Sequence, residues 1–305
     1  MSAGAPRSWL FVPGDSERKQ AKGLATDADA LILDLEDSVA AARLLTARAM
    51  VYEFLHAQPE RARQRLWVRV NALSSGRLFE DLAAVLPGEP AGIVLPKVDS
   101  YDDIERVARA LEALEARQGV PVGSTPLLVI ATETPAGLLA LPGFPRAAAA
   151  HGASARRLAG LTWGMEDLSA AVGARVRTDD AGVLRPTFQL ARTSCLLAAA
   201  AIGVPAIDGV YVDFRNHDGL REEAAQARAD GFSGKLAIHP EQVALINEAF
   251  TPTQAEIAWA RRVLQAFQAA DGAGVTVLDG RMIDRPHRVQ AERILASVDE
   301  RQGAA

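Results

Sequence analysis

The chain has 305 residues and contains one cysteine and no excess of basic charge. A single cysteine cannot form a disulfide within the chain, so the cytoplasm is the expected compartment. Cys195 lies in the apolar segment RTSCLLAAAAIG, which favours a buried, inert thiol over a nucleophile. The formal net charge of −5 offers no clustered Lys and Arg to neutralise phosphates, so we expect no nucleic-acid binding.

Long hydrophobic runs are also missing. No segment approaches the roughly 18 uninterrupted apolar residues of a membrane span, and the first residues, MSAGAPRSWLFVPGD, lack the apolar core of a signal peptide. We therefore expect neither membrane spanning nor secretion by a signal peptide. Apolar residues still make up 49% of the chain, which is enough to bury the core of a barrel-sized domain.

Short apolar runs do recur, and each is followed by a polar or Gly/Pro turn and then by a helix-length segment. This alternation is typical of βα units around a parallel sheet. The eight runs are Trp9–Val12, Ala30–Leu33, Leu66–Val70, Gly92–Leu95, Leu127–Ile130, Leu158–Leu161, Gly209–Val212 and Lys235–Ile238. Helices are predicted at Ser38–Leu55, Tyr101–Ala116, Thr187–Ala201 and Glu222–Ala229, among others. Eight units favour an α/β fold with a closed (β/α)8 TIM barrel over residues 1–245, and an open doubly wound sheet is the alternative.

Residues 246–305 exceed what a barrel needs. They contain a helix signal in TPTQAEIAWARRVLQAF, a Gly-rich link, the short run VTVLDGRMIDRP and a last helix. We predict a C-terminal helical extension. It would serve as a structural cap, as a lid over an active site, or as an arm that reaches a neighbouring subunit.

Acidic and basic residues follow the apolar runs repeatedly. Because the C-terminal ends of barrel strands meet at one face and carry the functional groups of this fold, such residues are expected to converge on an active site. The set comprises Asp15, Asp34, Glu36, Asp37, Arg69, Asn71, Lys97, Glu133, Glu166, Asp167, Asp213 and His239.

Carboxylates dominate this set, and no paired His or Cys ligands accompany them. Such oxygen donors suit Mg²⁺, or Mn²⁺, rather than zinc. Glu133 in ATETPAG and Asp167 in TWGMEDLSAAVG are the predicted metal ligands. The alternative is that each carboxylate only caps the helix that begins beside it.

Arg69 lies inside the strand sequence VRV, where an unpaired charge is costly to bury. It must therefore meet an anionic ligand or acids, and a structural ion pair with the cluster Asp34, Glu36 and Asp37 is the alternative. Lys97 would form a Schiff base in a metal-independent aldolase, but so many neighbouring acids favour a charged lysine.

Basic residues also follow the first run. Arg18 and Lys22 are four residues apart and share one helix face, which suits phosphate groups, although a solvated surface is the commoner meaning of such a pattern.

A series of motifs spread over nearly the whole chain carries a family resemblance. They are FVPGD, LILDLEDSV, VRVNALSSG, GIVLPKV, IATETPAGL, WGMEDLSAAVGA, GVYVDFRN, GFSGKLAIHPEQVALINEAFTP and GRMIDRP. In this order they resemble the HpcH/HpaI aldolase and citrate lyase β-subunit-like superfamily, most closely its citramalyl-CoA lyase and malyl-CoA lyase branch.

This resemblance implies a Mg²⁺ held by Glu133 and Asp167, with Arg69 contacting the substrate and stabilising an enolate. It also implies that Asp284, in GRMIDRP, is a general acid or base on an extension that closes over a neighbouring subunit, usually in a trimer or hexamer. The predicted coenzyme A contacts are Phe11, Arg18, Lys22, Val212 and Asp213. Many relatives carry Arg where this chain has Ser16, and Arg18 would supply the basic group instead.

The implied activity is Mg-dependent cleavage or formation of a short β-hydroxyacyl-CoA such as citramalyl-CoA or malyl-CoA. Asp34, Glu36, Asp37 and Lys97 would orient the metal-bound water and Arg69 from a second layer. Two alternatives stay open: a metal-dependent aldolase acting on free hydroxy-keto acids, and a citrate lyase β-type subunit that requires an acyl-carrier partner.

Overall fold

The computed structural model describes residues 5–302 except 59–64, 181 and 271–273. Eight parallel strands close into a barrel in the order of the sequence, so the prediction of a (β/α)8 barrel is confirmed and the open sheet is excluded. The strands are β1 (Ser8–Pro13), β2 (Ala30–Asp34), β3 (Arg65–Arg69), β4 (Gly92–Leu95), β5 (Leu127–Ile130), β6 (Leu158–Thr162), β7 (Ala206–Asp208) and β8 (Gly234–Ala237).

The seventh strand was wrongly predicted. Gly209–Val212 follows β7 as a loop, while the strand itself is the shorter segment Ala206–Asp208. The β-branched and aromatic residues after Gly209 imitate a strand, whereas the true strand ends on an acid. The buried Asp208 carboxylate accepts a hydrogen bond of 2.8 Å from Lys235 Nζ of the neighbouring β8.

The barrel interior is filled by apolar side chains from alternate positions of the strands. Trp9 and Trp67 meet edge to face with their ring centroids 5.1 Å apart. Gly92 has no side chain at this layer because a Cβ atom there would lie 2.2 Å from the Trp67 ring. The buried cluster comprises Trp9, Ala30, Ile32, Trp67, Val94, Leu128, Ile130, Ile207 and Leu236.

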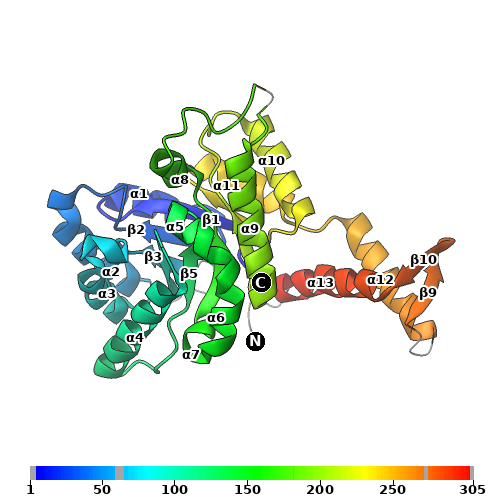
Figure 1. The fold of residues 1–305 in the computed structure, drawn as a ribbon, viewed down its shortest axis with the longest axis horizontal. Coiled ribbons are helices and arrows are strands. Elements are labelled where there is room, and N and C mark those ends of the chain that lie inside the picture. The colour runs from blue at the N-terminus through cyan, green and yellow to red at the C-terminus, as the bar shows by residue number, and fades with distance from the viewer. Residues whose placement is uncertain (1–4, 59–64, 181, 271–273, 303–305) are drawn as a thin grey trace. The chain divides into compact units, whose positions relative to one another are not determined.

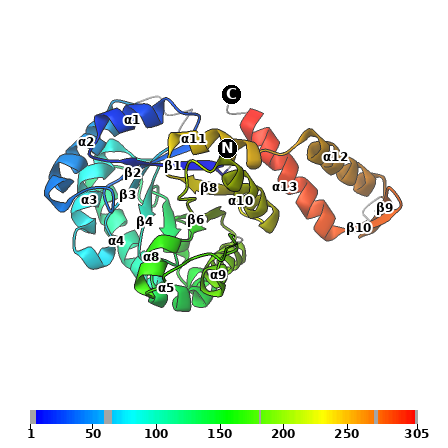
Figure 2. The same ribbon diagram turned by 90° about the horizontal axis from the view of Figure 1, so that it is seen from above.

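Helices surround the strands, as Figures 1 and 2 show. They are α1 (Glu17–Leu24), α2 (Leu44–His56), α3 (Leu78–Val85), α4 (Tyr101–Gln118), α5 (Pro135–Ala140), α6 (Phe144–Ala150), α7 (Gly152–Ala155), α8 (Met165–Ala171), α9 (Pro186–Ile202), α10 (His217–Asp230) and α11 (Pro240–Ala249), with short 3₁₀ turns at Ala41–Arg43, Leu73–Ser75, Leu86–Gly88 and Leu141–Gly143. None of the described helices is long and apolar enough to cross a membrane.

The chain divides into two compact units, Pro6–Ala249 and a second unit that contains Phe250–Ala305. The second unit consists of α12 (Gln254–Ala269), the antiparallel hairpin β9 (Val275–Leu278) and β10 (Arg281–Asp284), and α13 (Arg285–Gln302). Its own core contains Ala260, Val263, Phe267, Ile283 and Ala291. A C-terminal helical extension is thus present, and its action as a lid on a neighbouring subunit stays a prediction.

Candidate active site

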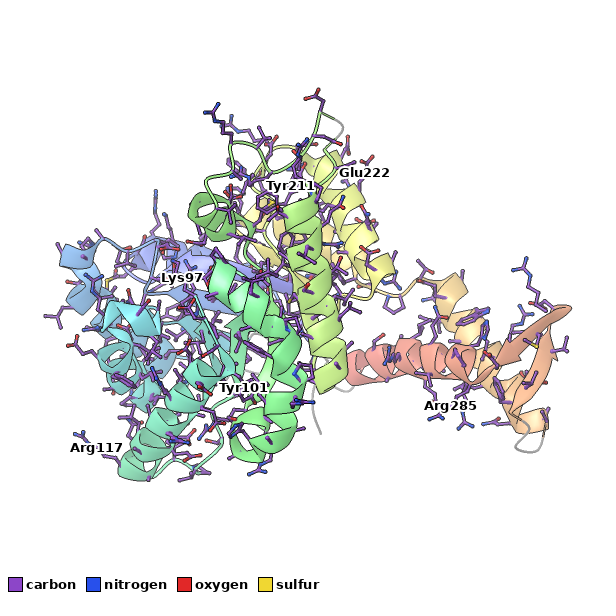
Figure 3. The ribbon with its side chains drawn as sticks, viewed as in Figure 1. Lys97, Tyr101, Arg117, Tyr211, Glu222 and Arg285 are labelled. Atoms are coloured by element: carbon purple, nitrogen blue, oxygen red, sulfur yellow. The ribbon has the colours of Figure 1, made fainter. Side chains whose placement is uncertain are left out.

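Charged residues at the ends of β2 to β6 come together at the mouth of the barrel. Lys97, which is labelled in Figure 3, lies just after β4. It links the group, because its Nζ lies 2.7 Å from Glu36, 3.1 Å from Asp37 and 3.4 Å from Asp167. Arg69 at the end of β3 contacts two of these acids, Glu36 and Asp37. The convergence predicted for these strand ends is therefore present in the folded chain.

Arg69 is held in one orientation by a forked ion pair. Its Nε and Nη2 donate to the two oxygens of Asp34 at 2.7 and 2.8 Å, and its Nη1 lies 3.0 Å from Glu36. The guanidinium also stacks over Phe11, 4.7 Å from the ring centroid. Burial alone would raise the pKa of Asp34, but the charge and hydrogen bonds of Arg69 outweigh it and lower that pKa. The structural ion pair anticipated for Arg69 exists, and it fixes where this cation points.

Lys97 adopts a left-handed backbone conformation with φ of 51°, which is uncommon for a residue with a side chain. In this conformation its backbone N–H donates to Glu133 Oε2 at 2.6 Å, while its side chain reaches Glu36 and Asp37. Burial would lower the pKa of Lys97, but the hydrogen bond and charge of Glu36 raise it. A lysine held in its charged form is a poor Schiff-base nucleophile, and this weighs against the metal-independent aldolase.

Glu133, just after β5, is a buried acid of the site, with only 4% of its surface exposed. Burial first, and then the charges of Glu36 and Asp167, raise its pKa to about 8 against the opposing effect of Arg69. Gly164 leaves the space that this side chain occupies, since a Cβ atom there would lie 2.5 Å from Glu133 Cγ. The fold has thus placed a buried carboxylate where its charge is not fully compensated.

The charges of this cluster fit a divalent cation. The cluster contains two cations, Arg69 and Lys97, and five carboxylates. The carboxylates are Asp34, Glu36, Asp37, Glu133 and Asp167. Within the described residues no three His, Cys, Asp or Glu side chains form a complete ligand set. Mg²⁺ commonly takes only one or two carboxylates and fills its other positions with water and substrate, so a pair such as Glu133 and Asp167 suits it.

A cavity of about 440 Å³ opens beside the cluster. Its polar wall includes Glu36, Asp37, Lys97 and Arg77. The other lining residues are Leu35, Val39, Ala41, Leu44, Asn71, Ala72, Ser74 and Ser75. A concave site that combines apolar residues with a few charged groups is a common arrangement for binding a small molecule.

The residues predicted to contact coenzyme A are more exposed. Arg18 and Lys22 lie on the exposed surface of α1, directly after β1. Val212 and Asp213 are exposed in the loop after β7. Their contact with a ligand stays a prediction.

Asp284 belongs to the second unit and ends β10. Its Oδ1 lies 2.6 Å from Nδ1 of His287 on the first turn of α13. The sequence pointed to Asp284 through its motif but not to His287, although the spacing of three residues at a helix start was visible in DRPH.

Two further contributors were missed. They are Gly164 and Asp208, to which the sequence assigned no role, the second because the predicted seventh strand began one residue after it. Asp208 accepts a hydrogen bond from the ring nitrogen of Trp163 at 2.8 Å, and Trp163 directly precedes Gly164. Only the folded register reveals that a buried acid of β7 supports the segment that leads to Asp167.

Comparison with known proteins identifies relatives along nearly the full length. The model of the HpcH/HpaI aldolase/citrate lyase family matches residues 7–240. The (3S)-malyl-CoA thioesterase of Cereibacter sphaeroides (strain ATCC 17029) is 37% identical over 96% of this chain and 94% of its own length. The Escherichia coli citrate lyase subunit beta is 38% identical over 96% and 93%. The mitochondrial citramalyl-CoA lyase of Rattus norvegicus is 33% identical over 95% and 85%.

A solved structure is similar in sequence and fold. It is the protein CitE from Mycobacterium tuberculosis in complex with magnesium, acetoacetate and coenzyme A, with a TM-score of 0.73 and 33% identity. The match covers 98% of this chain and 99% of that one.

Proposed function

We propose that this chain, which belongs to the HpcH/HpaI aldolase/citrate lyase family, is a Mg²⁺-dependent carbon–carbon lyase. It would cleave, or form, a short β-hydroxyacyl-CoA such as citramalyl-CoA or malyl-CoA, with acetyl-CoA and pyruvate or glyoxylate on the other side. The observation that carries the proposal is the excess of carboxylates around the buried Glu133, beside an open cavity. The solved relative that contains magnesium and coenzyme A supports it.

Glu133 and Asp167 would hold the metal, which supplies Lewis-acid polarisation of the substrate oxygens. Arg69 is the cation that would face the thioester oxygen where negative charge develops during cleavage. Its forked pairing with Asp34 keeps it oriented before substrate arrives, so little reorganisation is needed. Glu36, Asp37 and Lys97 would keep the ligand carboxylates and Arg69 in place.

Asp284 would act as the general acid or base at the acetyl carbon. In cleavage it protonates the enolate carbon of the departing acetyl-CoA, and in condensation it removes that proton. The coenzyme would lie along Phe11, Arg18, Lys22, Val212 and Asp213. A homotrimer or hexamer in the cytoplasm is part of the proposal, because the extension would close over a neighbouring barrel.

The test is acetyl-CoA release from citramalyl-CoA and from malyl-CoA by the purified chain, with Mg²⁺ and with EDTA. We expect release that requires the metal and is lost in Glu133→Gln. The ratio of the two rates identifies the preferred acyl group. The two substrates differ by one methyl group, which an apolar pocket discriminates by about 1–3 kcal/mol. EDTA-resistant release would contradict the metal mechanism and return attention to Lys97.

A second candidate is thioester hydrolysis, which the 37% identity to a malyl-CoA thioesterase favours. A thioesterase leaves the hydroxy acid intact and frees coenzyme A, whereas a lyase yields acetyl-CoA and a keto acid. Chromatography of the products from malyl-CoA separates the two activities directly.

A third candidate is a β-type citrate lyase subunit, which the 38% identity to the Escherichia coli protein favours. Such a subunit would be inactive on every CoA thioester and would become active only on a substrate carried by an acyl-carrier protein. Activity of the chain alone on either CoA ester therefore excludes this candidate.

A further inference from the structure

The second unit contains a carboxylate and an imidazole in direct contact. Asp284 Oδ1 lies 2.6 Å from His287 Nδ1, and the Asp284 backbone N–H lies 3.2 Å from the same nitrogen. Both side chains are partly open to solvent, with exposed fractions of 38% for Asp284 and 42% for His287. A pair that only stabilised the fold would gain little from such an exposed contact.

This contact shares features with the helix cap at the start of α12. There the Thr253 backbone N–H donates to Glu256, and the two side chains also meet, Thr253 Oγ1 donating to Glu256 at 2.8 Å. At the start of α13 the Asp284 backbone N–H likewise faces His287 Nδ1, but the side-chain partners are a carboxylate and an imidazole. When Nδ1 carries the ring proton it donates to Oδ1, and this bond fixes the orientation of the Asp284 carboxylate.

We propose that His287 is a positioning residue for Asp284. The imidazole Nδ1 holds Oδ1, so the carboxylate is kept in one rotamer with Oδ2 left for proton transfer to or from the acetyl-CoA carbon. A short acid side chain at a partly exposed helix start would otherwise sample several rotamers, and each wrong rotamer removes the base from reach of its proton.

Geometry makes His287 the suitable partner. Asp284 directly precedes α13 and His287 is the third residue of that helix, a spacing at which the two side chains of a helix start can meet. The next residue, Arg288, points elsewhere and pairs with Glu292 at 2.8 Å. Arg288 therefore provides a matched control on the same turn.

The inference rests on the proposed function, since it assigns Asp284 the acetyl proton. Its test measures deuterium incorporation from D2O into the methyl group of acetyl-CoA, together with kcat and KM for lyase turnover. The enzyme is used as the full chain with Mg²⁺ and either pyruvate or glyoxylate present.

We expect His287→Ala to lower both deuterium exchange and kcat at least tenfold while KM for the acyl-CoA stays within about twofold of wild type. His287→Asn retains a short donor near the same position and should recover most of the loss. Added imidazole should raise the exchange rate of His287→Ala but not that of wild type. Arg288→Ala should behave as wild type in every measurement.

Wild-type exchange by His287→Ala would overturn the proposal. So would an equal loss in His287→Ala and His287→Asn with no imidazole rescue and a lowered melting temperature, because that pattern belongs to a helix that has lost its start. Asp284→Asn separates this failure from failure of the function. If Asp284→Asn turns over normally, Asp284 is not the acid or base, whereas loss in Asp284→Asn alone refutes only the role of His287.

Discussion

Two buried ionic clusters of the barrel differ in their charge balance. In the first cluster, the Asp208 carboxylate at the end of β7 accepts three hydrogen bonds. The donors are Lys235 Nζ at 2.8 Å, Arg192 Nε at 3.0 Å and the Trp163 ring N–H at 2.8 Å. Burial would raise the pKa of Asp208, but these cations lower it. At the mouth, Glu133 lies among other acids and its pKa rises to about 8.

The difference in charge balance distinguishes a cluster that stabilises the fold from a cluster that binds a ligand. In the balanced cluster each buried charge has an opposite partner within the fold, because Asp208 meets both Lys235 and Arg192. These two cations also pair with the partly exposed Glu223 and Asp230 of α10, so the cluster joins β7, β8, α9 and α10. An unbalanced one costs stability and persists only where a ligand or metal supplies the missing charge. Burial alone does not separate them, since Asp208 and Glu133 are both almost inaccessible to solvent.

The largest effect is expected at the mouth. Glu133→Gln should lower metal-dependent turnover by a factor on the order of 10³, because the substrate oxygens lose their electrophile. The free energy of unfolding of this variant, measured in urea without metal, should stay equal or increase, since the fold already disfavours the charged form of this buried carboxyl and glutamine cannot ionise. A strong loss of stability would place Glu133 with the balanced cluster instead.

For the balanced cluster around Asp208 we expect the opposite result, a large loss of unfolding free energy. Lys235→Met leaves Asp208 without its main partner and should cost about 3–5 kcal/mol of unfolding free energy. The double variant Lys235→Met with Asp208→Asn should recover part of that loss, because no buried charge is left uncompensated. Urea unfolding measures both variants, and a mild effect of the single substitution would show that Asp208 tolerates being alone.

The sequence predicted the residues of the unbalanced cluster around Glu133 well and those of the balanced cluster around Asp208 poorly. Each mouth residue lies near the C-terminal end of an apolar run or within a few residues after it, so the barrel rule alone gathers Asp34, Arg69, Lys97, Glu133 and Asp167. The (β/α)8 fold followed from the same runs, because their spacing leaves room for one helix between successive strands.

Partners set by three-dimensional register were not predictable. Asp208 and Lys235 are far apart in the sequence, and the misplaced seventh strand hid their pairing. The left-handed backbone of Lys97 and the space that Gly164 leaves for Glu133 have no periodic signal, because each depends on a neighbour from another strand.

The stabilising effect of Mg²⁺ should also differ between variants of the two clusters. A ligand that binds only the folded chain stabilises it by about 2.7 kcal/mol at a concentration of 100 times its Kd. We expect Mg²⁺ to raise the unfolding free energy of the wild type by this amount in urea titrations. Glu133→Gln should show little increase, while Lys235→Met, although weaker, should show the full increase. Equal stabilisation of wild type and Glu133→Gln would move the metal to other ligands.

The smallest expected effect concerns a third buried pair, in which an acid is fully satisfied. Glu115 on α4 accepts from two nitrogens of Arg157 at 2.8 and 2.7 Å and from the backbone N–H of Gly123 and Thr125. Burial would raise the pKa of Glu115, but these hydrogen bonds outweigh it and lower the pKa to about 2.

Because the pKa of Glu115 in the folded chain lies below the ordinary value of 4.5, its contribution to stability is complete above about pH 5 and is lost as the pH falls toward 2. We expect about 2 kcal/mol of the acid-induced loss of unfolding free energy to come from this residue. Glu115→Gln is less stable at neutral pH but has no carboxyl to protonate, so its unfolding free energy should fall less steeply between pH 5 and 2. Parallel pH slopes for the two proteins would mean that the acid sensitivity of the barrel originates in other carboxylates, with those around Glu133 the first to be replaced.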